Sequence, residues 1–319
     1  EIDDVAITAP LTKYSASITD GNRINEFVDR AYKIATNGYP GAVHLSLPVD
    51  LMFSSFPEDA GRQERPFDLT SQAPSRAWPD PSRLETVLKK LEAASRPVLI
   101  GGHGVWWSCA EADLEEAGRT LGIPVFNIPY HQKLLGEESE AYMGLADVHQ
   151  YHPSADAFNE SDLVLMVGAR LDNQMNFGNA PLFPDTTELV CINGSHEEID
   201  FNRAADFTLL SDPSAFLKAL IALSDSPNFT GDRSWYNLNR KRRGEWVTKM
   251  LADVAEDANA PEFGGRIHPL QLAMDVQQAM GDEDWLVIDG GNTHFWSEIA
   301  VNLAGYQGKK LGGILHPGT

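Results

Sequence analysis

The sequence predicts an α/β protein built on doubly wound parallel sheets. Two observations carry this prediction. Between residues 81 and 223, segments with apolar residues at helical spacing alternate with short, almost wholly apolar runs, the pattern of strands buried on both faces of a parallel sheet. The chain is also 42% hydrophobic and 22% charged over 319 residues, which is ordinary for a globular protein and suits more than one domain.

The first segment predicts one helix and one strand. Residues 20–36 carry apolar side chains at helical spacing, and residues 42–47 form a buried type of strand after a Pro-Gly turn. One helix and one strand do not make a domain. Residues 1–56 are therefore expected to be the C-terminal part of a larger domain, and the polar, proline-rich residues 57–80 an inter-domain linker.

The central segment predicts a complete doubly wound domain at residues 81–224. Its helices are expected at residues 81–94, 110–122, 152–162 and 212–223. Its strands are expected at residues 97–104, 123–129, 163–171 and 188–193. Because helices and strands alternate, neighbouring strands should run parallel, with helices on both faces of the sheet.

The last segment predicts the beginning of a third unit. Residues 225–264 are expected to be a linker that includes a basic helix, and residues 265–319 to open a further domain. There, a helix leads to an apolar strand at residues 286–288. The strand ends in two glycines followed by hydrogen-bonding residues, and a second helix follows.

This strand-to-helix turn is the most informative stretch of the chain. Gly290 and Gly291 permit a positive φ and a close approach of the backbone to another group. Asn292 and Thr293 suit two roles, capping the following helix or donating to an anion at its N-terminus. The residues of the turn alone leave both roles open.

Composition excludes several classes of partner. With 46 Asp and Glu against 25 Lys and Arg, the net charge of -21 disfavours nucleic acid and anionic membrane surfaces. No apolar run approaches the roughly 20 residues that span a bilayer. Cys109 and Cys191 lie far apart, which favours a reducing cytoplasm, and no histidine has metal-ligand spacing.

Two strand ends of the central segment are rich in glycine. Gly101 and Gly102 end one expected strand, and Gly168 ends another, followed by Arg170 and Asp172. Ligands of doubly wound domains bind at the carboxyl ends of strands, so these residues could contact a nucleotide. The alternative is tight packing of strand against helix, because neither stretch is a complete dinucleotide-binding fingerprint.

The order of these segments resembles the thiamine-diphosphate enzymes of the acetohydroxyacid synthase group, which includes benzaldehyde lyase and 2-hydroxyacyl-CoA lyase. The resemblance covers nearly the whole chain and rests on "TKYSASI", "GYPGAVHLSLPVD", "RPVLIGGHGV", "SDLVLMVGARLD" and "VIDGGNTHFW". It implies three domains: a pyrimidine-binding domain, a central domain and a diphosphate-binding domain. The chain would contain the end of the first, all of the second and the start of the third.

The resemblance also implies cofactors and their residues. Thiamine diphosphate and Mg²⁺ are expected, with the diphosphate bound by Gly290, Gly291, Asn292, Thr293, Gly318 and Thr319. FAD is not expected, because Asn193 and Gly194 stand where the synthases carry acidic residues near the flavin's adenosine end. Arg170 and Asp172 match the family, which leaves an ADP or CoA moiety as an alternative ligand.

The resemblance places two catalytic elements outside this sequence. The activating glutamate is expected upstream of Glu1 and the metal motif beyond Thr319, so no metal ligand is assigned here and the segment alone is expected to be inactive. A homodimer or homotetramer, completed by the missing segments, is the expected assembly. The implied activity is a C–C bond lyase or carboligase acting on 2-keto or 2-hydroxy carbonyl compounds. The alternatives are a 2-oxoacid decarboxylase and a non-catalytic module that binds flavin or adenine nucleotide.

Overall fold

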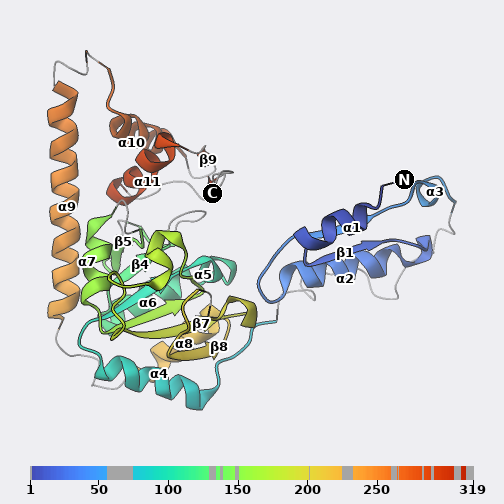
Figure 1. Ribbon diagram of the computed structural model, residues 1–319, viewed down its shortest axis with the longest axis horizontal. Coiled ribbons are helices and arrows are strands. Elements are labelled where there is room, and N and C mark those ends of the chain that lie inside the picture. Colours follow the sequence, from blue (N-terminus) through green and yellow to red (C-terminus); the bar gives the residue numbers. More distant parts are fainter. Residues whose placement is uncertain are drawn as a thin grey trace. The chain divides into compact units, whose positions relative to one another are not determined.

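The computed structural model describes residues 2–55, 75–128, 134–136, 139–147, 151–200, 202–224, 233–259, 264, 266–281, 284–288, 291–304 and 310–313. The chain divides into two compact units, Glu1–Arg76 and Ala77–Thr319. Figure 1 draws the first unit in blue and the second from cyan to red. Each unit is described by itself. No helix among the described residues combines the length and the apolar character needed to cross a bilayer.

The first unit contains a two-stranded parallel sheet. Strand β1 (Tyr14–Ser17) pairs with β2 (Val43–Ser46), with Tyr14 opposite Val43. The helices are α1 (Asp4–Thr8), α2 (Ile24–Thr36) and α3 (Val49–Met52), with short 3-10 turns at Ala9–Leu11 and Gly21–Arg23. The first unit therefore contains more helices and strands than the one helix and one strand that were expected. Strand β1 escapes a pattern search because its sequence, YSAS, has no apolar run.

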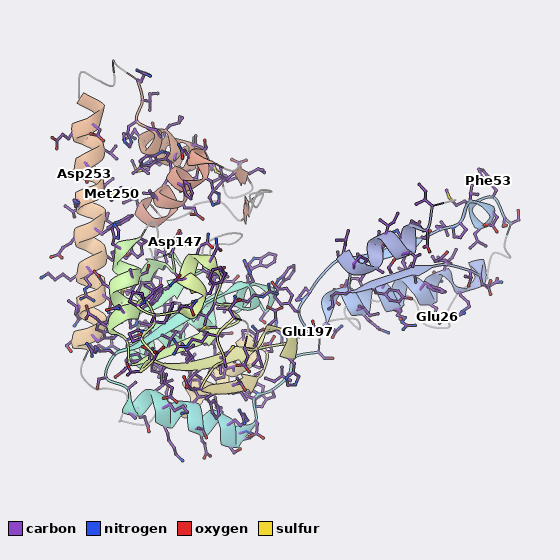
Figure 2. The ribbon with its side chains drawn as sticks, in the orientation of Figure 1. Glu26, Phe53, Asp147, Glu197, Met250 and Asp253 are labelled. Atoms are coloured by element: carbon purple, nitrogen blue, oxygen red, sulfur yellow. The ribbon has the colours of Figure 1, made fainter. Side chains whose placement is uncertain are left out.

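The first unit buries few apolar side chains. Ile18 and Ala31 are its only buried hydrophobic residues among residues 2–55. Several large apolar side chains are exposed instead, and Phe53, labelled in Figure 2, reaches 85%. The others are Ile2, Ile7, Leu11, Val28, Leu47, Val49 and Met52. The first unit by itself therefore leaves many of its large apolar side chains exposed.

The second unit is built on a six-stranded sheet in which every pairing is parallel. The strand order is β5-β4-β3-β6-β7-β8. The strands are β3 (Pro97–Gly101), β4 (Val125–Asn127), β5 (Tyr142–Leu145), β6 (Leu163–Val167), β7 (Glu188–Asn193) and β8 (Phe207–Leu210). The chain order reverses between β3 and β6, which is the point where such sheets open a crevice for ligands.

The central sheet is buried on both faces, as the apolar runs predict. Along β6, Leu163, Leu165 and Val167 enter one core, while Val164 and Met166 enter the other. Helices α4 (Pro81–Ala93), α6 (Glu111–Leu121) and α8 (Pro213–Leu223) contribute to the first core. Helix α7 (His152–Glu160) and the start of α9 (Ser234–Asn259) contribute to the second. The edge strands β5 and β8, which are four residues each, were not predicted from the sequence.

Helix α9 is longer than the sequence analysis expected. It runs for 26 residues, through the stretch interpreted as a linker after the basic segment. Trp235 packs in the second core at its start, Trp246 contacts both the second and the third core, and Val254 is buried in the third. Figure 1 shows α9 in orange, alongside the central domain and reaching the red helices. The buried aromatic and apolar residues stabilise the helix beyond its basic stretch.

The C-terminal part of the second unit is a parallel β-α-β unit. Helix α10 (Pro269–Ala279) precedes β9 (Trp285–Ile288), and α11 (Asn292–Ala304) connects β9 to β10 (Lys310–Gly313). Trp285 pairs with Lys310 in the parallel register. The third core contains Leu270 and Met274 from α10 and Ala300 and Leu303 from α11, together with Val254. The strand and helix predicted on either side of the glycine turn are confirmed.

Glycines bring β3 and β6 into very close contact at their carboxyl ends. The N–H of Gly102 donates to Val167 O and the N–H of Gly104 to Gly168 O, each at 2.9 Å. Gly168 has φ +59, and a Cβ added there would lie 2.6 Å from Gly104 Cα. Side chains at these positions would force the two backbones apart.

Replacing Gly168 with Ala should therefore lower the free energy of unfolding by about 2 to 5 kcal/mol, combining left-handed backbone strain with overpacking. Urea unfolding followed by circular dichroism would measure the change. Gly244→Ala on α9 is the matched control, because an added Cβ there meets nothing within 4 Å. It should raise the stability by about 0.5 to 1 kcal/mol. Equal midpoints for the two variants would contradict the close packing.

Candidate functional site

The glycine turn lies at the carboxyl end of β9. Gly291 has φ +84, a conformation that favours glycine, and a Cβ added there would meet nothing within 4 Å. The glycine therefore serves the backbone conformation, and the space beside it is open. Gly290, Gly318 and Thr319, which were expected to bind with it, lie outside the described residues.

Asn292 and Thr293 form the first two positions of α11. Both side chains are exposed, and neither makes a hydrogen bond to another described residue. The backbone of the turn is closed by the N–H of His294, which donates to Gly291 O at 3.1 Å. Within the described part of the chain, no side-chain hydrogen bond therefore supports the capping role. An amide and a hydroxyl group stand at the N-terminus of a 13-residue helix, where an anion is stabilised.

A groove of about 540 Å³ opens beside this turn. Leu272, Ala273 and Val276 line it from α10, Leu286, Val287 and Ile288 from β9, and Asn292, Thr293 and Trp296 from α11. Its surface is mostly apolar, and none of its lining residues is charged. The groove therefore suits an uncharged ring or an apolar segment of chain, with hydrogen-bond donors from the turn.

His268 contacts all three helices around this groove, α9, α10 and α11. Its Nδ1 accepts the N–H of Leu270 at 3.2 Å, which caps α10, and its Nε2 lies 3.6 Å from Asp257 Oδ2 of α9. Its ring also packs edge to face on Trp296 of α11, with centroids 5.2 Å apart. A buried histidine with these contacts fixes the groove wall. His268 was not among the site residues predicted from the sequence.

A second histidine, His294, contacts a buried acid on the same helix. Its Nε2 lies 3.2 Å from Oε1 of Glu298, one turn along α11. The Glu298 side chain is only 3% exposed. The close approach of the Glu298 carboxylate raises the pKa of His294, burial opposes this, and the charges of Glu298 and Asp147 raise it further. This pair was not predicted from the sequence, although the four-residue spacing of a histidine and a glutamate on one helix is a recognisable signal.

The glycines of the central domain lie at the predicted strand ends. Gly101 ends β3, Gly102 follows it, Gly168 follows β6, and the two strand ends are adjacent. The N–H groups of Gly102 and Gly168 donate to the carbonyls of Val167 and Ile192, so these donors serve the sheet. The geometry accounts for these glycines by close packing of the backbone.

Arg170 and Asp172 also have structural contacts. The guanidinium group of Arg170 donates through Nε and Nη2 to the two carboxylate oxygens of Glu198, whose side chain is 5% exposed. Asp172 accepts the N–H of Gln174 at 3.1 Å and so caps a 3-10 turn, while burial raises its pKa. The structure brings both residues to the carboxyl side of β6. Among the described residues, no three His, Cys, Asp or Glu side chains are arranged to hold a metal.

Comparison with known proteins agrees with this architecture. Residues 84–220 match the family described as thiamine pyrophosphate enzyme, central domain. The acetolactate synthase large subunit of Cyanidium caldarium is 25% identical over 98% of this chain and 52% of its own length. The 2-hydroxyacyl-CoA lyase of Arabidopsis thaliana is 25% identical over 92% of this chain and 50% of its own length.

A solved structure shows a similar fold. The benzoylformate decarboxylase from Polynucleobacter necessarius has a TM-score of 0.69 at 18% identity, covering 98% of this chain and 53% of that one. The chain thus spans about half the length of the relatives that it matches. Residues 84–220 thus match the family described as thiamine pyrophosphate enzyme, central domain, and the chain is distantly similar, over most of its length, to acetolactate synthase and 2-hydroxyacyl-CoA lyase.

Proposed function

We propose that this chain is part of a thiamine-diphosphate-dependent lyase or carboligase acting on 2-keto or 2-hydroxy carbonyl compounds. The turn from Gly291 to Thr293 carries the proposal, because it presents an open backbone, two neutral donors and a helix N-terminus together. The relatives named above support the enzyme class. When bound, the cofactor supplies the electron sink for making or breaking a C–C bond next to a carbonyl.

The described residues fit the diphosphate end of this cofactor. The glycine turn allows phosphate oxygens to approach the backbone, Asn292 donates through its amide and Thr293 through its hydroxyl group. The helix N-terminus adds a favourable partial positive charge. Since the groove lining contains no Lys or Arg, these groups orient the diphosphate without neutralising it. We assign no described residue to Mg²⁺.

Asn292→Ala and Thr293→Ala should each weaken the binding of thiamine diphosphate by roughly 10- to 100-fold, because each removes one hydrogen bond to a charged group. Titration of the full-length enzyme with the cofactor and Mg²⁺, followed by tryptophan fluorescence, would measure this, since Trp296 lines the groove. Asn292→Asp should weaken binding further than Asn292→Ala, because it places a negative charge beside the diphosphate.

Thr248→Ala is the control for these variants. Thr248 is exposed on α9, and its hydroxyl donates to Gly244 O at 2.8 Å. Its replacement should leave cofactor affinity unchanged. Unchanged affinity in Asn292→Ala and Thr293→Ala as well would contradict the proposed diphosphate site and would leave the two residues as ordinary members of a helix terminus.

The central domain is proposed to bind no FAD tightly. Asn193 is buried at the end of β7, where its Oδ1 accepts the N–H of Gly194 at 2.8 Å, and Arg170 is paired with Glu198. The purified enzyme should therefore be colourless, and a stoichiometric flavin absorbance would contradict this. An ADP or CoA moiety remains an alternative, and equilibrium dialysis with each compound would test it.

We further propose that other residues of the same enzyme cover the exposed apolar surfaces, within a homodimer or homotetramer. Phe53 in the first unit is 85% exposed, and Val287 of β9 is 64% exposed beside the groove. Within the described residues, β9 pairs along one edge only, with β10. Relatives about twice as long as this chain contain enough additional sequence to cover these surfaces.

The segment expressed alone should therefore self-associate or melt in separate steps, because its apolar patches remain in water. Sedimentation velocity and thermal melting followed by circular dichroism would test this. The full-length enzyme, run in parallel, should form a discrete oligomer. A monodisperse monomer of the segment with one cooperative transition would contradict the proposed assembly.

We also propose that the enzyme is cytoplasmic. Cys109 and Cys191 are both free thiols. Burial raises the pKa of Cys191 to about 11, so that this thiol stays protonated and unreactive. An exposed free thiol such as Cys109 is compatible with a reducing compartment.

A further inference from the structure

A buried glutamine joins α10 to α11 by a hydrogen bond. Gln277 of α10 is 2% exposed, and its Nε2 donates to Ser297 O of α11 at 3.3 Å. Because a carbonyl oxygen only accepts, the amide nitrogen of Gln277 is the atom that faces it. The core around this contact is formed by hydrophobic side chains of the two helices, among them Met274 and Ala300.

A second hydrogen bond continues from Ser297 to the glycine turn. The hydroxyl of Ser297 donates to Thr293 O at 2.9 Å, one helical turn closer to the start of α11. Gln277, Ser297 and Thr293 all line the groove beside β9. Two consecutive hydrogen bonds therefore connect α10 to the residue whose hydroxyl group is proposed to bind the diphosphate.

The direction of the hydrogen bond from Gln277 gives it a role that apolar packing cannot fill. Burial of apolar surface depends on area and hardly on orientation, so two helices joined by hydrophobic side chains alone can shift along their contact. A single buried polar side chain can fix the register of packed helices, as it does in coiled coils. A shift of α11 along α10 would carry the donors of the turn with it.

The contact is unlikely to exist for stability, because it leaves an acceptor unpaired. Gln277 Oε1 is buried and has no hydrogen-bond partner among the described residues, which costs stability. Ser297 O lies within α11, where the helical N–H four residues further on satisfies it without Gln277. An apolar side chain of the same length would therefore be at least as stable at this position.

We propose that Gln277 is a positioning residue, which acts through Ser297 to fix the place of Thr293 at the start of α11. The inference rests on the proposed function, because it concerns the place of a group that is proposed to bind thiamine diphosphate. Gln277 holds α11 against α10, and Thr293 meets the diphosphate oxygens.

Gln277→Met tests the contact without the cofactor, because methionine has a similar length and no amide. In the cofactor-free full-length enzyme, hydrogen exchange followed by mass spectrometry should show α11 exchanging about 2- to 10-fold faster, as for one lost hydrogen bond. The midpoint of urea unfolding should stay the same or rise. Gln278→Met is the matched control, since Gln278 is the next residue on α10 and is exposed. Exchange as slow as in the wild type, or a lower midpoint, would overturn the positioning role.

Cofactor affinity tests whether Gln277 acts through the turn. Gln277→Met and Ser297→Ala should each weaken the binding of thiamine diphosphate by about 2- to 10-fold. Ser297→Thr keeps the hydroxyl group and should bind the cofactor as the wild type does. In Thr293→Ala, which lacks the positioned hydroxyl group, Gln277→Met should have a smaller effect than in the wild type. Fully additive effects of these two substitutions, or normal affinity in Gln277→Met, would overturn the proposal.

The two proposals fail in different ways. If Asn292→Ala and Thr293→Ala both bind thiamine diphosphate normally, the proposed site is wrong, and hydrogen exchange still decides whether Gln277 fixes α11. If both variants bind weakly while Gln277→Met matches the wild type in exchange and affinity, the site is right and the positioning role is wrong.

Discussion

Burial of the central sheet on both faces is the constraint on which the second unit depends. The residues of β6 alternate between two cores, so neither face can be left in water. Helices α4, α6 and α8 cover one face, whereas α7 leaves room on the other that the start of α9 fills. The same helix then contributes Val254 to the third core. Covering the sheet thus determines where α10 and α11, and the turn between β9 and α11, are attached.

The candidate site offers uncharged hydrogen-bond donors within a strongly acidic chain. The chain carries a net charge of -21, and the groove lining has no cation. An anion at the turn would meet hydrogen-bond donors and a helix N-terminus, and two buried acids of the unit, Glu298 and Glu198, each lie against a basic side chain, His294 and Arg170. Such an arrangement orients an anion and leaves its charge to be balanced by a metal ion or by another part of the enzyme.

Much of this fold could be predicted from local pattern, and the missing parts have physical reasons. Apolar runs marked the strands that are buried on both faces, but β5 and β8 are short edge strands, and polar β1 has no such run. The glycine turn was visible because its residue types are unusual after a strand. The packing of Gly102 on Gly168 was not visible, because tertiary structure alone brings these residues together.

Helix α9 also connects the packing of the second core to that of the third core. Its 26 residues give a length of about 39 Å, and one end is anchored by Trp235 in the second core while the other reaches the third. Trp246, halfway along the helix, also packs against the second core, so about 20 Å of the helix extends beyond this contact. A tilt of about 5° there would displace the far end by about 2 Å. Substitutions in the core around Trp246 are therefore expected to alter the geometry of the groove without touching a ligand.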